Sequence, residues 1–258
     1  MVDKAAIVTG AGSGIGRATA LQLAAKGYHV GVLGRTKSEL DETRAAILKA
    51  GGDATTVVAD VSDHAEMHQA VRDFVASAGR LDVVVANAGI NGVWAPIDDL
   101  QPEEWSKTIG INLTGTYLTI HHCVPHLKAS GGGSIIVVSS INGTRTFTTP
   151  GATAYTATKA AQVAMVKQLA LELARHHIRI NAVCPGEIET SIDTNTNLRH
   201  EEETAIPVVW PDGQVPITGG RPGRSEDVAS VIGFLVSDEA RHMTGSPVWV
   251  DGGQGLLR

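Results

Sequence analysis

The stretch that decides the fold is Thr9-Gly10-Ala11-Gly12-Ser13-Gly14-Ile15-Gly16. It closes the short apolar run Ala5–Thr9 and leads into a helical pattern at residues 17–26. Glycine permits turns that a Cβ atom would forbid, and it lets the backbone approach a pyrophosphate closely. The following helix N-terminus adds unpaired N–H groups and a partial positive charge. Because the glycines lie between a strand and a helix, we predict a dinucleotide-binding loop rather than an ordinary glycine-rich turn.

Outward from this loop, the chain alternates short apolar runs with helical stretches. Continuous rather than alternating apolar runs indicate strands that are buried on both faces. Strand–helix alternation then implies a parallel sheet with right-handed crossovers and helices on both sides. We predict one domain over residues 1–258, an α/β fold with a Rossmann-type doubly wound parallel sheet of about seven strands. The expected strands lie at residues 5–9, 28–33, 55–59, 83–86, 135–139, 178–183 and 248–250.

The composition excludes several classes of protein. The chain has 258 residues, 43% of them apolar, which is enough for a large core without a disulfide or a structural metal. The net charge is −6 and the basic residues are scattered, so no block suggests nucleic acid or an anionic membrane. No apolar run approaches the length of about 18 residues that spans a bilayer. We expect a cytoplasmic protein without a secretory signal, in which Cys123 and Cys184 are buried thiols.

One long segment interrupts the alternation. Residues 186–225 are rich in Thr, Asn, Pro and Gly, and they leave the carboxyl end of an expected strand. Ligands bind outside such strand ends in open α/β sheets. A connection of this length in a compact domain is typical of a functional lid. We therefore interpret residues 186–225 as a partly helical, substrate-covering flap, with an insertion of no function as the alternative.

A tyrosine and a lysine carry the strongest catalytic signal. Tyr155 and Lys159 lie four residues apart in a helical stretch, which places both side chains on one face. A free phenol has a pKa of about 10 and is a poor base at neutral pH. A nearby ammonium favours the phenolate and lowers that pKa, as a general acid/base requires. The pair would be unremarkable on a surface helix, but the glycine loop and the strand order favour the catalytic interpretation.

Several ordered motifs resemble the short-chain dehydrogenase/reductase family, in particular its glucose and ribitol dehydrogenase-like members. Gly10, Gly14 and Gly16 have the family's spacing, and further motifs follow through nearly the whole chain. The resemblance implies a catalytic set of Asn112, Ser140, Tyr155 and Lys159. It also implies cofactor contacts by Gly10, Ser13, Gly14, Ile15, Gly16, Arg35, Asp60, Val61, Asn87, Ala88, Gly89, Tyr155, Lys159, Pro185, Gly186, Ile188 and Thr190.

By this resemblance, the protein is expected to be an NAD(P)-dependent oxidoreductase that moves a hydride between the nicotinamide and an alcohol/carbonyl substrate. Tyr155 would exchange the proton with the substrate oxygen, and Lys159 would hold the nicotinamide ribose. Ser140 would donate to the substrate oxygen; Ser139 is its rival, and the family pattern favours Ser140. Asn112 would hold a water that links Lys159 to solvent.

The resemblance also bears on substrate and assembly. It implies a small polyol, sugar or ketone as substrate. Glu187 and Glu189, which follow Pro185-Gly186 at the pocket mouth, are candidate contacts for a polar substrate, with acids on the surface of the flap as the alternative. No single residue specifies one substrate or the direction of the reaction. The interval from Ser140 to Tyr155 is slightly longer than is usual in the family, which we interpret as an insertion at residues 144–150. The resemblance also implies a homotetramer in which the apolar tail at residues 250–258 lies at a subunit interface.

The choice of cofactor depends on the residues after the second expected strand. An Asp or Glu there would bind the ribose 2′-hydroxyl of NAD and repel a 2′-phosphate. This chain has Gly34 and then Arg35, whose guanidinium suits a phosphate. Ser13 stands where NADP-preferring relatives often carry a second basic residue. We predict NADP, with NAD or the use of both as the alternative.

Two other interpretations were weighed. His121, His122 and His126 have helical spacing that could suggest a metal, but no carboxylate or cysteine completes a site, so we expect no metal. The competing class of function is a non-catalytic dinucleotide-binding sensor or scaffold, since a fold alone does not give a function. Such proteins typically lack the tyrosine or the lysine, and both are present here.

Overall fold

The computed structural model of the chain describes residues 2–190, 196–205 and 215–257. Its central sheet has seven strands in the order β11-β7-β6-β4-β1-β2-β3, and every neighbouring pair is parallel. The strands are β1 (Ala5–Thr9), β2 (His29–Gly34), β3 (Asp53–Val58), β4 (Val83–Ala86), β6 (Gly133–Val138), β7 (Ile178–Pro185) and β11 (Pro247–Val250). The predicted doubly wound parallel sheet is confirmed.

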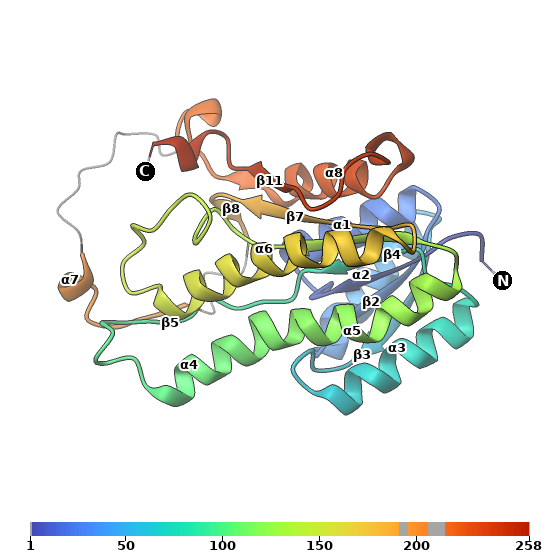
Figure 1. Cartoon of the computed structure of the whole chain (residues 1–258), viewed down its shortest axis with the longest axis horizontal. Helices are drawn as coiled ribbons and strands as arrows, with labels where there is room; N and C mark the ends of the chain where they lie inside the picture. Colours follow the sequence, from blue (N-terminus) through green and yellow to red (C-terminus); the bar gives the residue numbers. More distant parts are fainter. Residues whose placement is uncertain (1, 191–195, 206–214, 258) are drawn as a thin grey trace.

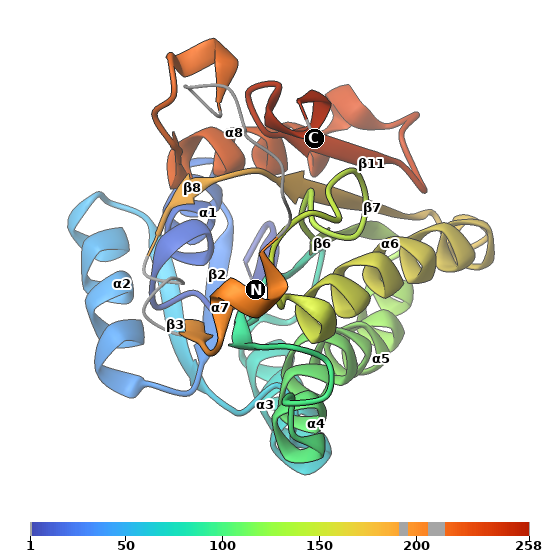
Figure 2. The same ribbon diagram turned by 90° about the vertical axis from the view of Figure 1, so that its left-hand side faces the viewer.

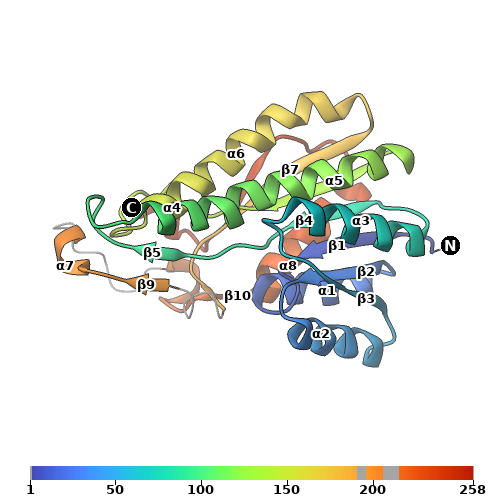
Figure 3. The same ribbon diagram turned by 90° about the horizontal axis from the view of Figure 1, so that it is seen from below.

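Helices cover both faces of this sheet. One layer holds α1 (Gly14–Ala25), α2 (Lys37–Lys49) and α8 (Ser225–Leu235), and the other holds α3 (His64–Ala78), α5 (Gly115–Ala129) and α6 (Thr153–Ala174). Figures 2 and 3 show the two layers on opposite sides of the strands. Such a sandwich explains why the strand sequences read as continuous apolar runs: residues of β1 and β4 are buried toward both layers.

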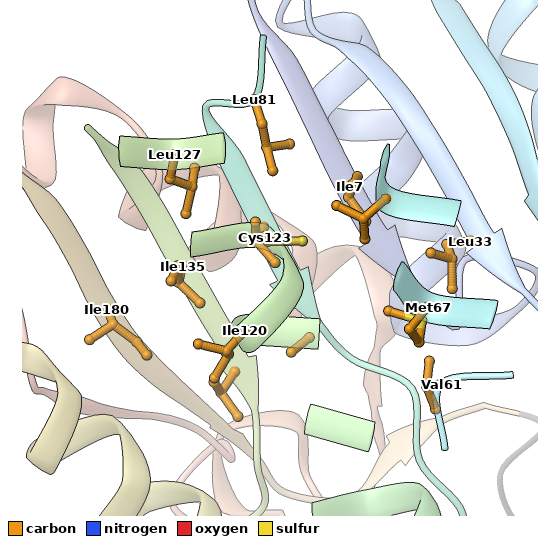
Figure 4. Close-up of a cluster of buried hydrophobic side chains, with 14 of the residues drawn as sticks. Ile7, Leu33, Val61, Met67, Leu81, Ile120, Cys123, Leu127, Ile135 and Ile180 are labelled. Atoms are coloured by element: carbon orange, nitrogen blue, oxygen red, sulfur yellow. The ribbon is translucent and has the colours of Figure 1, made fainter. Parts of the chain in front are cut away.

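The core on the α3, α5 and α6 side is formed by aliphatic side chains of strands and helices (Figure 4). Ile7, Leu81 and Ile135 are fully buried there, and Cys123 lies among them. Cys184 is buried as well, so both cysteines are free, buried thiols as predicted. Burial raises the pKa of Cys123 to about 12 and that of Cys184 to about 11, which makes both thiols inert at neutral pH.

Strand boundaries differ from the prediction at β3. The predicted strand began at residue 55, whereas β3 begins at Asp53. Asp53 lies opposite His29 in the parallel register, and its carboxylate is 2.7 Å from the imidazole Nδ1 of His29. The polar pair therefore extends the strand beyond the apolar run on which the prediction depended.

The segment after β7 returns to the body of the protein through small structures. Ile188–Glu189 (β8) pairs with Gly223–Arg224 (β10), and Thr196–Leu198 (β9) pairs with Gly92–Trp94 (β5). A short helix, α7 (Glu201–Thr204), follows β9. Figure 1 shows β5, α7 and the start of α4 (Pro102–Ile109) at the end of the molecule opposite the N-terminus. Part of the predicted flap, residues 191–195 and 206–214, lies outside the described residues.

No helix among the described residues has the length and the apolar character that crossing a membrane requires.

Candidate active site

The glycine loop closes tightly at the carboxyl end of β1. Gly10 has a φ of +66°, a conformation that strains any residue with a Cβ atom. A Cβ atom on Gly16 would lie 2.1 Å from the Gly10 carbonyl oxygen, so the first turn of α1 can approach the loop only because residue 16 is glycine. The Ser13 side chain does not cap α1, which leaves the first amides of the helix available for an anion.

A buried threonine joins this loop to the neighbouring strand. Thr9 is 1% exposed, and its Oγ1 accepts hydrogen bonds from the backbone N–H groups of Asn87 and Ala88, both at 3.0 Å. The Asn87 side chain returns a hydrogen bond from Nδ2 to the Thr9 carbonyl oxygen at 2.9 Å. These bonds hold the ends of β1 and β4 together where the order of the strands reverses, which is the place where open α/β sheets bind ligands.

Tyr155 and Lys159 share one face of α6 as predicted, and both line a cavity of about 410 Å³. The Lys159 Nζ lies 5.4 Å from the centre of the Tyr155 ring and donates to the Val138 carbonyl oxygen at 3.0 Å. Burial lowers the pKa of Lys159 to about 8. Burial raises the pKa of Tyr155, and a hydrogen bond with Ser140 opposes that rise. A buried Tyr155 phenolate alone, or a buried Lys159 ammonium alone, is thus costly to form, whereas the two together are a neutral ion pair.

The two serines at the end of β6 have different surroundings. Ser139 donates from Oγ to the Lys159 carbonyl oxygen at 2.8 Å, so its hydroxyl is occupied in joining β6 to α6. The Ser140 Oγ accepts from the Asn142 backbone N–H at 3.1 Å and lies within hydrogen-bonding reach of Tyr155. Because its hydroxyl proton is free of the backbone, Ser140 is the better placed of the two to donate to a substrate oxygen.

Asn112 lies in a π-helical turn, Gly110–Thr114, between α4 and α5. Such turns are frequent at functional sites. The Asn112 side chain is fully buried and makes two hydrogen bonds of 2.9 Å with the backbone of Ile90. The backbone carbonyl oxygen of Asn112 accepts from Gln162 Nε2 at 2.8 Å and from Thr116 Oγ1 at 2.7 Å. These contacts fix the strand end beside Lys159, and the water-holding role of Asn112 stays a prediction.

A second, smaller cavity of about 150 Å³ lies beyond the glycine loop. Arg35 lines it and is 3.6 Å from the Asp60 carboxylate. Burial acts to raise the pKa of Asp60, but hydrogen bonds from Ser62 and the charge of Arg35 outweigh it, and the net pKa is lowered. The cavity also holds Glu39, which the sequence analysis missed; its Oε2 would lie 2.8 Å from a Cβ atom on Gly12.

The predicted site residues divide between the two cavities. The larger one is lined by Ile15, Asn87, Gly89, Ser140, Tyr155, Lys159, Pro185, Gly186, Ile188 and Thr190. The smaller one is lined by Gly10, Ser13, Arg35, Asp60, Val61, Ala88 and Gly89. Gly14, Gly16 and Asn112 line neither cavity and act through the backbone that they shape. Gly89 belongs to both cavities, so together they form one elongated site along the strand ends.

Several residues of the larger cavity were not predicted. They are Asn91, Trp94, Val138, Ser139, Ile141, Asn142, Thr149, Glu187 and Gln254; Ser139 and Glu187 had been considered as candidates, and Thr149 lies in the insertion expected at residues 144–150. Trp94 lies 6.3 Å from Tyr155 between ring centres. Gln254 comes from the C-terminal segment that had been assigned to a subunit interface. Val138 and Ser139 belong to the strand predicted at residues 135–139, whereas no local pattern marks the others, because their segments meet only in the folded chain.

Polar contacts hold the β9 part of the flap to the body. Asn91 donates from Nδ2 to Thr196 Oγ1 at 2.6 Å. Arg199 bonds to both carboxylate oxygens of Glu104, at 2.9 Å each, and to the Asp99 carboxylate. The Arg199 guanidinium and a hydrogen bond from the Gln101 backbone hold the pKa of Glu104 below its usual range. This part of the flap is therefore fixed beside Trp94, at the wall of the larger cavity.

The histidines of α5 gather with two histidines of α3. His122 is buried, with ring centres of His64 and His68 at 4.9 and 5.3 Å. Burial, reinforced by the neighbouring imidazoles, lowers the pKa of His122 to about 4, so it is neutral at pH 7. No group of three or more His, Cys, Asp or Glu in the described part of the chain is arranged to hold a metal ion.

Comparisons with known proteins identify the family to which this chain is similar. A family model described as enoyl-(acyl carrier protein) reductase matches residues 10–254. Levodione reductase from Leifsonia aquatica is 34% identical over 254 residues, which cover 98% of this chain and 94% of the relative.

Two solved structures extend the comparison. The crystal structure of a 3-ketoacyl-ACP reductase from Sinorhizobium meliloti 1021 is 70% identical, with a TM-score of 0.94 over 98% of this chain and 100% of the other. A 3-ketoacyl-(acyl-carrier-protein) reductase from Brucella melitensis, complexed with NADH, is 32% identical, with a TM-score of 0.86 over 98% and 99% of the two chains.

Proposed function

This chain belongs to the short-chain dehydrogenase/reductase family and is a nicotinamide-dependent oxidoreductase of an alcohol/carbonyl pair, and from that premise we propose which residues do the work. Tyr155 is the general acid/base, Ser140 donates to the substrate oxygen, Lys159 supplies the compensating charge, and Asn112 positions the site. A bound nicotinamide supplies or accepts the hydride. The observation that carries the proposal is that Tyr155, Ser140 and Lys159 line one cavity together with Pro185 and Gly186.

In this proposal the side chains move one proton. When an alcohol is oxidised, Tyr155 takes the hydroxyl proton as a phenolate; when a carbonyl is reduced, the phenol returns it. Burial raises the pKa of Tyr155, so the phenolate forms readily only beside the Lys159 ammonium. Ser140 holds the substrate oxygen at the phenol and stabilises the charge that develops on it. The amides of the glycine loop and of α1 fit the pyrophosphate of a dinucleotide.

We propose NADP as the preferred cofactor. Arg35 lines the smaller cavity, and its guanidinium would bind the 2′-phosphate of NADP there. Asp60 and Glu39 flank the same cavity and favour an uncharged 2′-hydroxyl, so NAD remains the alternative. The test is steady-state efficiency with each cofactor. A higher kcat/KM with NAD(H) than with NADP(H) refutes this part of the proposal.

The substrate that we propose is a small polyol, sugar or ketone. Among the described residues that line the larger cavity, the only cationic side chain is Lys159, and Asn91, Asn142, Thr149, Glu187 and Gln254 are polar. We further propose a cytoplasmic homotetramer of single-domain subunits, in which residues 186–225 cover the substrate. The mass measured in solution tests the tetramer, and limited proteolysis with and without cofactor tests whether residues 186–225 cover the site.

The deciding experiment follows nicotinamide absorbance with purified protein and a panel of polyols, sugars and small ketones. Tyr155→Phe is expected to bind cofactor normally and to lose at least about a hundredfold in rate. Tyr117→Phe is the matched control, because Tyr117 is 49% exposed on α5 and lines neither cavity. Near-normal turnover of Tyr155→Phe would exclude Tyr155 as the acid/base. Cofactor binding without turnover of any panel member would favour the sensor or scaffold.

A further inference from the structure

Gln254 presents an oriented amide to the larger cavity. It begins the 3-10 turn Gln254–Leu256, is 4% exposed and lines the cavity. Its Oε1 accepts the Glu187 backbone N–H at 2.7 Å. A backbone N–H needs an acceptor, so this bond settles which end of the amide is the oxygen. Nε2 therefore lies at the opposite end, and it donates no hydrogen bond to any described residue.

Asn142, on the loop after Ser140, brings a second amide to the same cavity. Its Oδ1 accepts from Thr149 Oγ1 at 2.9 Å, and its Nδ2 donates to none of the described residues. Neither Nδ2 of Asn142 nor Nε2 of Gln254 is among the buried atoms that lack a partner, so both amino groups remain accessible from the cavity. The Asn142 backbone N–H donates to Ser140 Oγ, which places this amide next to the catalytic serine.

The two amides stand on segments that are bonded to each other. Asp251 accepts from the backbone N–H groups of Gly253 and Gly255, at 3.1 Å each, and so shapes the turn that carries Gln254. Arg145, on the loop that carries Asn142, pairs with the same carboxylate at 3.4 Å and stacks on Trp249 at 3.9 Å. The donors are therefore held in place before a substrate enters, which is what selective recognition requires.

Resting on the proposed function, we propose that Asn142 and Gln254 select the substrate by donating hydrogen bonds to a second oxygen. Ser140 and Tyr155 occupy the oxygen on the reacting carbon, so the two amides must serve another acceptor within the same small cavity. That acceptor is a hydroxyl or carbonyl oxygen near the reacting carbon, as in a hydroxyketone, a diketone or a diol. Glu187 lines the same cavity, and its negative charge disfavours a substrate carboxylate.

The selectivity follows from the cost of unpaired donors. A substrate without the second oxygen removes water from the two amides and leaves their N–H groups unsatisfied. Sites built to hydrogen-bond a substrate oxygen discriminate strongly against analogues that lack it. A conservative expectation for one partly accessible amide is a preference of about tenfold.

The test compares substrates that differ by one oxygen: acetoin with butanone, and dihydroxyacetone with acetone. In Gln254→Glu, one carboxylate oxygen still accepts the Glu187 N–H, but the other accepts where the amide donated. This variant is expected to lose at least about tenfold in kcat/KM on the oxygen-rich member of each pair, and little on the plain ketone. Asn142→Asp is expected to behave in the same way. Gln69→Glu, exposed on α3, is the matched control for the added charge.

Equal losses on both members of a pair would overturn the inference and leave the proposed function intact, whereas turnover by Tyr155→Phe would sink the proposed function itself. A change confined to the KM of the cofactor would assign the Gln254 amide to the nicotinamide and also overturn the inference. The inference is also overturned if the wild-type protein prefers butanone to acetoin, or if it binds cofactor but turns over neither oxygen-rich ketone. If Gln254→Glu does not fold, Gln254→Met removes the amide donor without a new charge; because it also removes the acceptor of the Glu187 N–H, only the difference in loss between the two members of each pair is compared.

Discussion

The hydroxyl of Thr9 allows a quantitative test of how β1 and β4 are joined. Its Oγ1 accepts two backbone N–H groups, those of Asn87 and Ala88, and donates to the Val85 carbonyl oxygen at 3.4 Å. Thr9→Val replaces this hydroxyl with a methyl group of similar size and leaves both N–H groups without an acceptor. Thr9→Ser keeps the hydroxyl and removes only the methyl group.

The magnitudes separate the two variants. Each N–H left unsatisfied costs about 1–3 kcal/mol, so Thr9→Val loses about 2–6 kcal/mol of unfolding free energy. The lower half of that range is expected, because Asn87 and Ala88 are only partly buried and water can reach them. Thr9→Ser loses one buried methyl group, about 1 kcal/mol. The hydrogen bonds, rather than the packing, should thus account for most of the loss.

The assay is urea unfolding of both variants and the wild type at one protein concentration, with the slope m checked for constancy. Cofactor titration follows on the folded proteins. Because Ala88 and Gly89 line the cofactor cavities, Thr9→Val is also expected to weaken cofactor binding, and Thr9→Ser is not. If Thr9→Val is no less stable than Thr9→Ser, the two hydrogen bonds do not join the strands as we infer.

Two further predictions concern charge. Burial lowers the pKa of Lys159 to about 8, whereas an unfolded lysine titrates near about 10.4. The buried ammonium therefore destabilises the free protein fully below pH 8, and this cost fades as the pH rises toward the unfolded value. Lys159→Met should abolish turnover yet raise the unfolding free energy at pH 7 by about 2 kcal/mol, after the lost bond to Val138 is counted, and this gain should be gone by pH 10; a loss of stability at pH 7 contradicts this. Arg199→Met should raise the substrate KM several-fold, and Arg199→Lys less. Because the pKa of Glu104 is depressed, the wild-type KM should stay constant as the pH falls through the ordinary carboxyl range and rise only below it; an earlier rise contradicts the ion pair's role.

What the sequence could predict was local. The glycine loop, Tyr155 and Lys159 were found because each pattern depends on residues close together in the chain: a strand, a turn and a helix, or two side chains four apart on one helix. The parallel sheet followed from apolar runs, because burial on both faces removes the alternation of polar residues. The sequence could not show the π-helical turn that carries Asn112, since the partner that holds the Asn112 backbone carbonyl group, Gln162, lies on α6.

The rest depends on segments that are distant in the chain. Glu39 reaches the smaller cavity only because the first turn of α2 packs against the glycine loop. Gln254 was predicted as part of an interface, since a C-terminal position says nothing about the cavity that the segment closes. Its role depends on the Glu187 N–H, and nothing in either stretch of sequence indicates that they meet. Long-range hydrogen bonds of this kind carry no sequence periodicity.

The residues proposed for proton transfer and the residues proposed for substrate recognition lie on different segments, so the specificity can change separately from the chemistry. The residues that we propose for proton transfer stand on α6 and just after β6, two elements whose positions the core fixes. The amide donors stand on the loop after Ser140 and on the C-terminal turn, which contact each other through Arg145 and Asp251. Substitutions in these two segments can therefore alter the accepted substrate without moving Tyr155. Because Asp251 also orders the turn that carries Gln254, loss of Arg145 should disturb both donors together, so the two segments act as one recognition unit rather than as two independent contacts.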